Sequence, residues 1–201
     1  MFSTTRLVVL GAIYQFQPVH GYFLRRELLT WNVDEWANIQ PGSIYNALRS
    51  LKKDGYVVET GTEVEGNRPE RTVFEMTPEG EAEFFKLLRE ALWTVRTFDP
   101  KPVMALTSFM FALSRQEVLQ ALANRVTVID AQIQSNEFFI VDVNRSQSTP
   151  KYVREIYELT SARLRGEQQW AVDLQERLRQ GEYVFAGEAD SSRATPPPAA
   201  G

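Results

Sequence analysis

The first half of the chain alternates apolar and polar positions at helical spacing. One apolar stripe predicts a helix over 4–17, which Pro18 ends, and a second helix is expected from Gly21 to about Thr30. A loop over 32–40 follows. The inward stripe of the next predicted helix consists of Ile44, Ala47, Leu48 and Leu51.

This third helix carries its own start and stop signals. Ser43 is predicted to cap its free backbone N–H groups, and Gly55 suits the left-handed position after the last turn. Strands are then predicted over 56–60 and 71–76, because β-branched and aromatic residues alternate there. Together with the intervening tip over 61–70, they form a predicted β-hairpin.

The second half of the chain is predicted to be helical. Thr77 is the expected N-cap of a helix that runs to about Phe98, and Ser114 the N-cap of one that runs to about Val143. A last helix covers about 151–180. In the middle helix apolar residues alternate by four and three over three heptads, which is coiled-coil spacing, with Asn136 as a polar residue in the seam.

Composition and charge narrow the function. The chain has 201 residues, of which 43% are hydrophobic and 24% charged, so it is long enough and apolar enough for one or two globular domains. It has no cysteine and a single histidine, His20, which argues against thiolate metal sites, thiol nucleophiles and a Ser-His-Asp triad. We predict no catalytic residues, no metal, no cofactor and no enzyme. The net charge of −4 argues mildly against nucleic acid, unless the basic residues cluster locally.

Targeting and membrane signals are weak. The apolar start of the chain lacks the small-residue cleavage site of a signal peptide, so a buried first helix is expected. The apolar run over 103–113 is shorter than the ~20 residues that span a bilayer. We therefore expect a cytoplasmic protein with no membrane partner.

Four ordered sequence blocks carry a resemblance to a known family. They are His-Gly-Tyr at 20–22, Pro-Gly-Ser-Ile-Tyr-Asn-Ala-Leu-Arg-Ser-Leu-Lys-Lys-Asp-Gly-Tyr-Val at 41–57, Gly-Asn-Arg-Pro-Glu-Arg-Thr-Val-Phe at 66–74, and Thr-Pro-Glu-Gly at 77–80. In this order and at these separations the blocks closely resemble the PadR-like transcriptional regulators. Asn67 departs from the usual Gly-Arg-Pro run of the wing.

The predicted element order and the resemblance together define the expected fold class. It is mainly α with a small β-hairpin: a winged helix-turn-helix domain over 1–98, followed by long α-helices over 101–185. The resemblance implies that these long helices form a dimerisation region. The proline- and alanine-rich segment 186–201 is expected to be a disordered tail.

A winged helix places its third helix in the major groove of DNA and its wing beside it. The residues predicted to contact DNA are Tyr22, Ser43, Tyr45, Asn46, Arg49, Lys52, Lys53, Arg68 and Arg71. Five of them also have a plainer interpretation: the two lysines stabilise the end of a helix dipole, the Tyr22 ring is partly buried, and the two wing arginines lie in a solvated loop with glutamates.

The long helices are predicted to hold two chains together. The expected dimer contacts are Leu119, Leu122, Val126, Ile129, Ile133, Asn136, Ile140, Trp170 and Leu174. The resemblance also implies a small aromatic effector, for which Trp93 and Phe98 are the candidate binding residues; core packing is the competing interpretation of the tryptophans.

The functional hypothesis is a homodimeric transcriptional repressor that binds double-stranded DNA at a pseudo-palindromic operator. The alternative is a winged-helix module that binds protein and does not recognise DNA. A small-molecule enzyme is the least supported class, because no nucleophile and base stand at a suitable spacing.

Overall fold

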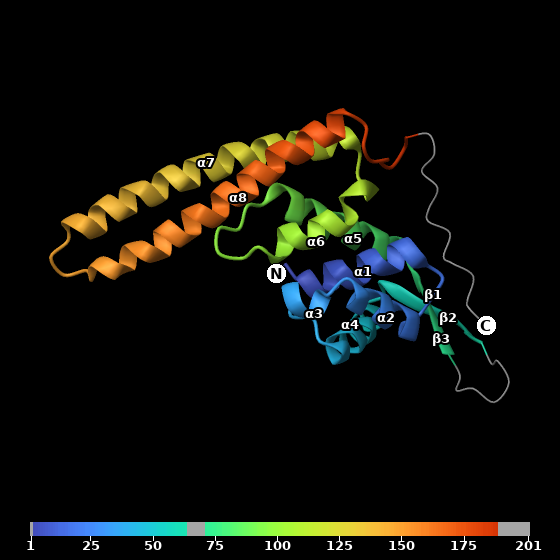
Figure 1. Cartoon of the computed structure of the whole chain (residues 1–201). Helices are drawn as coiled ribbons and strands as arrows, with labels where there is room; N and C mark the ends of the chain where they lie inside the picture. The colour runs from blue at the N-terminus through green and yellow to red at the C-terminus, as the bar shows by residue number, and fades with distance from the viewer. Residues whose placement is uncertain (1, 64–70, 189–201) are drawn as a thin grey trace. The chain divides into compact units, whose positions relative to one another are not determined.

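The structure is a computed structural model that describes residues 2–63 and 71–188 (Figure 1). It is mainly helical with one small antiparallel sheet, as the sequence predicts. The chain divides into two compact units. Of the described residues, the first unit, here called the winged-helix unit, takes in those up to Glu90 and Met104–Phe109; the second, the hairpin unit, takes in Ala91–Val103 and residues 110–188.

The winged-helix unit follows the predicted order of elements, with three additions: β1, α3 and the end of α6. Its elements are α1 (Thr4–Phe16), β1 (Val19–His20), α2 (Gly21–Thr30), α3 (Val33–Trp36), α4 (Pro41–Lys53), β2 (Val57–Glu63), β3 (Arg71–Met76), most of α5 (Pro78–Trp93) and the last six residues of α6 (Lys101–Phe109).

The sheet has three strands in the order β1-β3-β2, and all neighbours are antiparallel. Val19 pairs with Phe74, and β2 pairs with β3 from Val57 opposite Met76 to Glu63 opposite Arg71. The register shifts between Glu59 and Gly61. The sequence does not predict β1, because two residues are too few to show a strand period.

The core of the winged-helix unit forms around α1, whose residues 7–13 are all buried. A helix that is apolar on every side belongs in an interior, which explains why α1 lacks a polar face. Aromatic rings complete this core. The Phe84 ring stacks on Tyr14 with 5.0 Å between ring centroids and meets Phe109 edge-on with 5.9 Å between centroids. The Trp31 and Phe109 ring centroids are 5.8 Å apart.

The start of α5 matches its predicted cap. Thr77 Oγ1 accepts a hydrogen bond from the backbone N–H of Gly80 at 3.0 Å and donates one to the carbonyl of Gly55 at 2.8 Å. A Cβ at Gly80 would lie 2.0 Å from the carbonyl oxygen of Tyr56. Glycine therefore stands where a capping box usually has Glu or Gln, because the Tyr56 carbonyl, just before β2, lies too close for a side chain.

The other end of α5 differs from the prediction. The helix ends at Trp93, five residues before Phe98. Thr94, Val95 and Thr97 are β-branched, and such residues lose rotamer freedom in a helix. Further along, α6 occupies a segment for which the sequence predicts no element, and α3 lies within the predicted loop over 32–40.

The hairpin unit is built on two long helices that run side by side (Figure 1). After η1 (Met110–Ala112), α7 covers Arg115–Arg145, and after η2 (Lys151–Val153), α8 covers Arg154–Arg179. The predicted cap of α7 is confirmed, since Ser114 Oγ accepts from the backbone N–H of Glu117 at 3.2 Å.

A buried arginine joins three parts of this unit. Arg125 on α7 is 1% exposed. Its Nη1 donates to Glu167 on α8 at 2.7 Å, and its Nη2 donates to the carbonyls of Ala91, Leu92 and Thr94 at 2.9, 3.1 and 3.2 Å. Arg125 thus satisfies the last carbonyl groups of α5, which the helix itself leaves without partners.

The end of the described chain packs back onto the hairpin unit. Arg115 donates to both carboxylate oxygens of Glu188 at 2.7 Å, and the backbone N–H of Ala186 donates to the carbonyl of Phe111 at 3.0 Å. The Arg115 guanidinium, helped by the backbone N–H of Phe185, lowers the pKa of Glu188 from 4.5 to about 2. Residues 186–188, assigned to the tail from composition, are therefore held by specific contacts.

Candidate nucleic-acid interface

The candidate interface is centred on α4, whose two faces differ sharply. Ile44, Ala47, Leu48 and Leu51 are buried and fix the helix against the rest of the unit. The opposite face exposes Tyr45, Asn46, Arg49, Lys52 and Lys53. Because the apolar stripe holds the helix in place, its polar side chains project outward from a rigid element.

The start of α4 differs from the prediction that Ser43 is its N-cap. The helix begins three residues earlier, with Gln40 as its N-cap and Pro41 as its first residue, and Gln40 makes no side-chain capping bond. Proline is well suited to the first helical position, because its φ is already helical and it has no N–H to satisfy. Ser43 lies half-buried in the first turn, and its backbone N–H donates to the Gln40 carbonyl at 2.8 Å.

Two side-chain contacts organise the exposed face of α4. Arg49 Nη2 donates to Asn46 Oδ1, one turn earlier on the same helix. Lys52 Nζ lies 2.5 Å from Glu59 Oε2 on β2. The first contact orients the guanidinium, and the second partly neutralises the lysine.

The start of α2 borders the same face. Tyr22 is 61% exposed, so its ring is not part of the core. Gly21 precedes it in a tight position, where a Cβ would lie 3.2 Å from the Phe74 ring. The absent side chain therefore lets α2 begin directly against β3, which brings Tyr22 next to α4.

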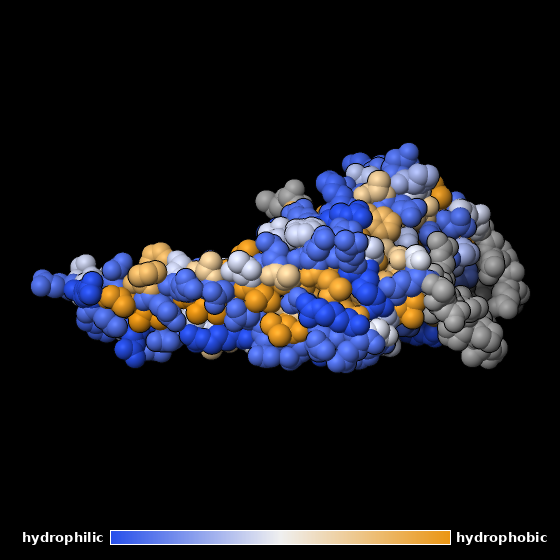
Figure 2. All heavy atoms as spheres, turned by 90° about the horizontal axis from the view of Figure 1, so that it is seen from above, coloured by the Kyte–Doolittle hydropathy of each residue, from blue (hydrophilic) through white to orange (hydrophobic). Residues whose placement is uncertain are grey.

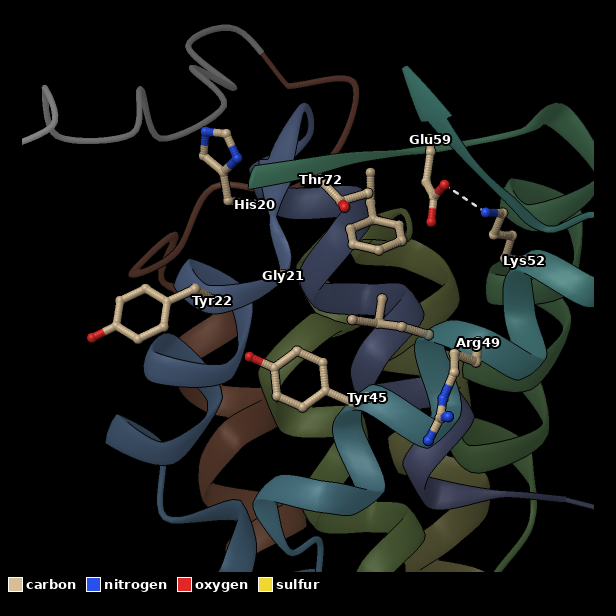
Figure 3. Close-up of a pocket in the computed structure, with 10 residues that line it drawn as sticks. His20, Gly21, Tyr22, Tyr45, Arg49, Lys52, Glu59 and Thr72 are labelled. Carbon is tan, nitrogen blue, oxygen red and sulfur yellow. Dashed lines mark hydrogen bonds and ion pairs between the residues drawn. The ribbon is translucent and has the colours of Figure 1, made fainter. Parts of the chain in front are cut away.

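Residues of β1, α2, α4, β2 and β3 line an open hollow of about 470 Å³ (Figure 3). In the close-up, His20 and Tyr22 lie on one side, Arg49, Lys52 and Glu59 on the other, and Tyr45 between them. The complete lining is His20, Gly21, Tyr22, Tyr45, Leu48, Arg49, Lys52, Glu59, Thr72 and Phe74.

Five of the predicted DNA contacts are thus placed on or beside one continuous surface: Tyr22, Tyr45, Asn46, Arg49 and Lys52. Lys53 is exposed in the last turn of α4. In the wing, the backbone of Arg71 pairs with Glu63 at the start of β3, and Arg68 lies outside the described residues. Sequence reasoning missed Glu59, Thr72 and Phe74, which only the pairing of β2 with β3 brings to the hollow.

Several residues that are predicted to contact a second chain pack against other residues of their own chain. Ile129 and Ile133 form a buried cluster with Leu164 of α8. Asn136 is buried as well, and its Nδ2 donates to Ser161 Oγ at 3.0 Å. Leu122 and Leu174 are buried, whereas Leu119, Val126, Ile140 and Trp170 are half-buried. Their role between two chains stays a prediction.

The two candidate effector residues have exposed side chains: Trp93 ends α5, and Phe98 follows it in the connection to α6. Across residues 2–63 and 71–188, no group of three or more histidine, aspartate or glutamate residues is placed to hold a metal ion. Within the same part of the chain, no helix is both long enough and apolar enough to cross a membrane.

The order of helices and strands up to α5, with an exposed polar stripe on the third long helix, defines a winged helix-turn-helix protein. Residues 9–86 match the model of the transcriptional regulator PadR-like family. This matched segment lies within the winged-helix unit, which is therefore similar to the PadR-like transcriptional regulators.

Two solved structures are similar to the chain. The crystal structure of Bacillus subtilis PadR in complex with operator DNA has 18% sequence identity and a TM-score of 0.34, covering 86% of this chain and 98% of that one. The crystal structure of smu.1604c from Streptococcus mutans UA159 has 19% identity and a TM-score of 0.39, covering 90% and 99%. None of the curated proteins matches the sequence.

Proposed function

We propose that this PadR-like regulator is a homodimeric repressor that binds a pseudo-palindromic operator in the cytoplasm, where it meets the chromosome. The observation that carries the proposal is the exposed stripe of Tyr45, Asn46, Arg49 and Lys52 on a helix whose other face is buried. A helix of this kind fits the major groove, and its side chains then meet the edges of the bases.

Each residue of the stripe has a role in this proposal. Arg49 donates to a guanine through its two parallel N–H groups, and Asn46 holds the guanidinium in the required orientation. Lys52 and Lys53 contact phosphates, for which they need only charge and reach. The Tyr22 hydroxyl donates a hydrogen bond to a phosphate, which lies beside the free backbone N–H groups at the start of α2.

An apolar surface on the hairpin unit supports the homodimer. Tyr152 in η2 and Ile156 and Leu159 in α8 stand at i, i+4 and i+7, and all three are exposed. On α7, Phe138 is 74% exposed. Figure 2 shows apolar side chains along this hairpin. A large exposed apolar surface marks an interface, and a second copy of the chain offers the same surface under two-fold symmetry.

In this proposal the protein represses transcription by occupying its operator. Two α4 helices related by the two-fold axis bind half-sites about one turn, ~34 Å, apart and exclude polymerase from the promoter. Release needs a ligand that binds the DNA-incompetent state more tightly, because only differential affinity shifts the equilibrium. A small aromatic effector that stacks on Trp93 and Phe98 fits this requirement.

The first experiment is a selection from random duplex DNA with the purified protein at ~150 mM salt, where phosphate contacts alone bind weakly. We expect an enriched two-fold-symmetric site. Arg49→Ala should weaken binding to it by ~10- to 100-fold, since a bidentate pair discriminates by about 1–3 kcal/mol.

The matched control is Arg163→Ala, which removes the same charge from an exposed position on α8. It should leave operator affinity within about 2-fold of the unmodified protein, because surface substitutions away from an interface have small effects. A folded protein that enriches no site favours the protein-interaction module. Equal losses in both variants show that only total charge matters.

A further inference from the structure

The hollow beside α4 is unusual for a surface that binds a polyanion, because its floor is apolar. Leu48 is buried at its base, Phe74 is half-buried on β3, and Gly21 adds no side chain between them. The charged groups stand only along one edge, and there Lys52 is already paired with Glu59. The hollow as a whole therefore favours an apolar group over a phosphate.

One stripe of α4 forms the wall of this hollow. Tyr45, Arg49 and Lys52 stand at i, i+4 and i+7, on the exposed face of the helix, and Leu48 of the buried stripe lies at the base beside them. Arg49, the residue proposed to bind guanine, therefore borders the hollow directly. Whatever enters the hollow when α4 docks lies beside the base that Arg49 contacts.

The major-groove edge of DNA presents a single apolar group, the C5-methyl group of thymine. We infer that the hollow receives the C5-methyl edge of a thymine, packed on the Tyr45 ring and the floor formed by Leu48 and Phe74. A volume of about 470 Å³ admits the edge of the base together with its methyl group. The inference rests on the proposed function and adds a second base to each half-site.

The spacing on α4 predicts where this thymine stands. Tyr45 and Arg49 are four residues apart, about 6 Å along the helix axis, and neighbouring bases are ~3.4 Å apart. The thymine therefore lies within about two base steps of the guanine bound by Arg49. Each half-site of the operator contains one such pair.

The test uses the full-length protein and the operator obtained by selection. Each thymine is replaced in turn by deoxyuridine, which removes only the methyl group and keeps every hydrogen-bonding group. We expect one position in each half-site to lose about 4-fold in affinity, the effect of one buried methyl group, while the other thymines stay unchanged.

Two variants connect the effect to the hollow. In Tyr45→Ser the loss on removing the methyl group should vanish, because the ring that covers the methyl group is gone. In Arg49→Ala overall affinity should fall, yet the 4-fold loss should persist. Tyr45 is exposed, so its replacement leaves the buried stripe of α4 intact.

The outcomes separate this inference from the proposed function. An operator that is bound but insensitive to every deoxyuridine overturns the inference alone. So does a uniform small loss at all thymines, which indicates a change in DNA shape, or a methyl effect that survives Tyr45→Ser. A chain that selects no operator overturns the proposed function and this inference with it.

Discussion

The two units of the chain differ in how many large apolar side chains they leave exposed to solvent. In the described part of the winged-helix unit, the large apolar side chains that stay exposed are Tyr22, Tyr45, Val58 and Met104. The hairpin unit exposes many more: Trp93, Phe98, Val128, Phe138, Phe139, Val141, Tyr152, Ile156, Leu159, Val172 and Val184.

Geometry explains the difference. Several helices and a sheet surround α1, so each apolar stripe of the winged-helix unit meets another element. Where α7 and α8 pack as a pair, each helix covers only one face of the other. The remaining apolar faces stay exposed in the single chain. The winged-helix unit thus buries most of its large apolar side chains by itself, and the exposed faces of the hairpin unit are the basis of the proposed homodimer.

The largest expected effect is a loss of stability in the hairpin unit. In Arg125→Ala, Glu167 loses its cation and three carbonyls at the end of α5 lose their donor. Removing one partner of a buried ion pair costs about 3–5 kcal/mol. Urea unfolding followed by circular dichroism should show this loss of stability.

The control for Arg125 is Arg165→Ala. Arg165 lies 3.6 Å from Glu137, and both side chains are exposed. An exposed pair contributes about 0–1 kcal/mol, so the unfolding midpoint should barely move. Similar losses in the two variants would contradict the structural role given to Arg125.

The next effect tests whether the exposed face of the hairpin holds two chains together. Phe138→Ser removes a strongly exposed aromatic side chain of that face and should weaken dimerisation by ~30-fold, the effect of a ~2 kcal/mol hot spot. Sedimentation velocity over a concentration series measures the change. Leu159→Ser should act in the same direction.

Val184→Ser is the matched control, since Val184 is also exposed but follows α8. Its dimer constant should equal that of the unmodified protein. A Phe138→Ser protein that stays fully dimeric at nanomolar concentration would show that the interface lies elsewhere and that the two units differ for another reason.

A smaller effect concerns the winged-helix unit. Asn46→Ala removes the acceptor that orients Arg49 but leaves the charge in place. A single hydrogen bond contributes about 0.5–1.5 kcal/mol, so operator affinity should fall by ~2- to 10-fold while the slope of affinity against salt stays constant. Fluorescence anisotropy at several salt concentrations measures both. A changed slope would mean that Asn46 acts through phosphate contacts.

The smallest effect is the pH response of the contact that closes the hairpin unit. Arg115 lowers the pKa of Glu188 to about 2, so the carboxylate adds stability above its ordinary pKa of 4.5, and this stability is lost as the pH falls towards 2. Urea midpoints measured from pH 6 to pH 2.5 should converge between the unmodified protein and Glu188→Gln. Parallel curves would contradict this contribution.

Local signals predicted much of the winged-helix unit. Thr77 and Ser114 cap their helices as expected, because an N-cap depends on a few neighbouring residues. The predicted N-cap of α4 was wrong by three residues, Ser43 in place of Gln40, because proline and serine both suit a helix start and the local sequence does not choose between them. The division into domains at 98 and 101 stays a prediction.

The candidate site was predictable only along its own helix. Tyr45, Asn46, Arg49 and Lys52 follow from helical periodicity, which places them opposite the buried stripe. Glu59, Thr72 and Phe74 reach the hollow through strand pairing, and no periodicity within a segment specifies which strands pair. The register of this pairing also shifts between Glu59 and Gly61.

The sequence by itself determined the order of the main helices, the hairpin and the resemblance to PadR-like regulators, because these depend on spacing within short segments. Tertiary structure decided two further features: β1, which exists only against β3, and the partner of the α7 seam. Heptad spacing indicates that the apolar seam of α7 is buried, but a helix of the same chain and a helix of another chain can cover it equally well. Here α8 covers Ile129, Ile133 and Asn136, because the connection through 146–150 lets the chain turn back on itself.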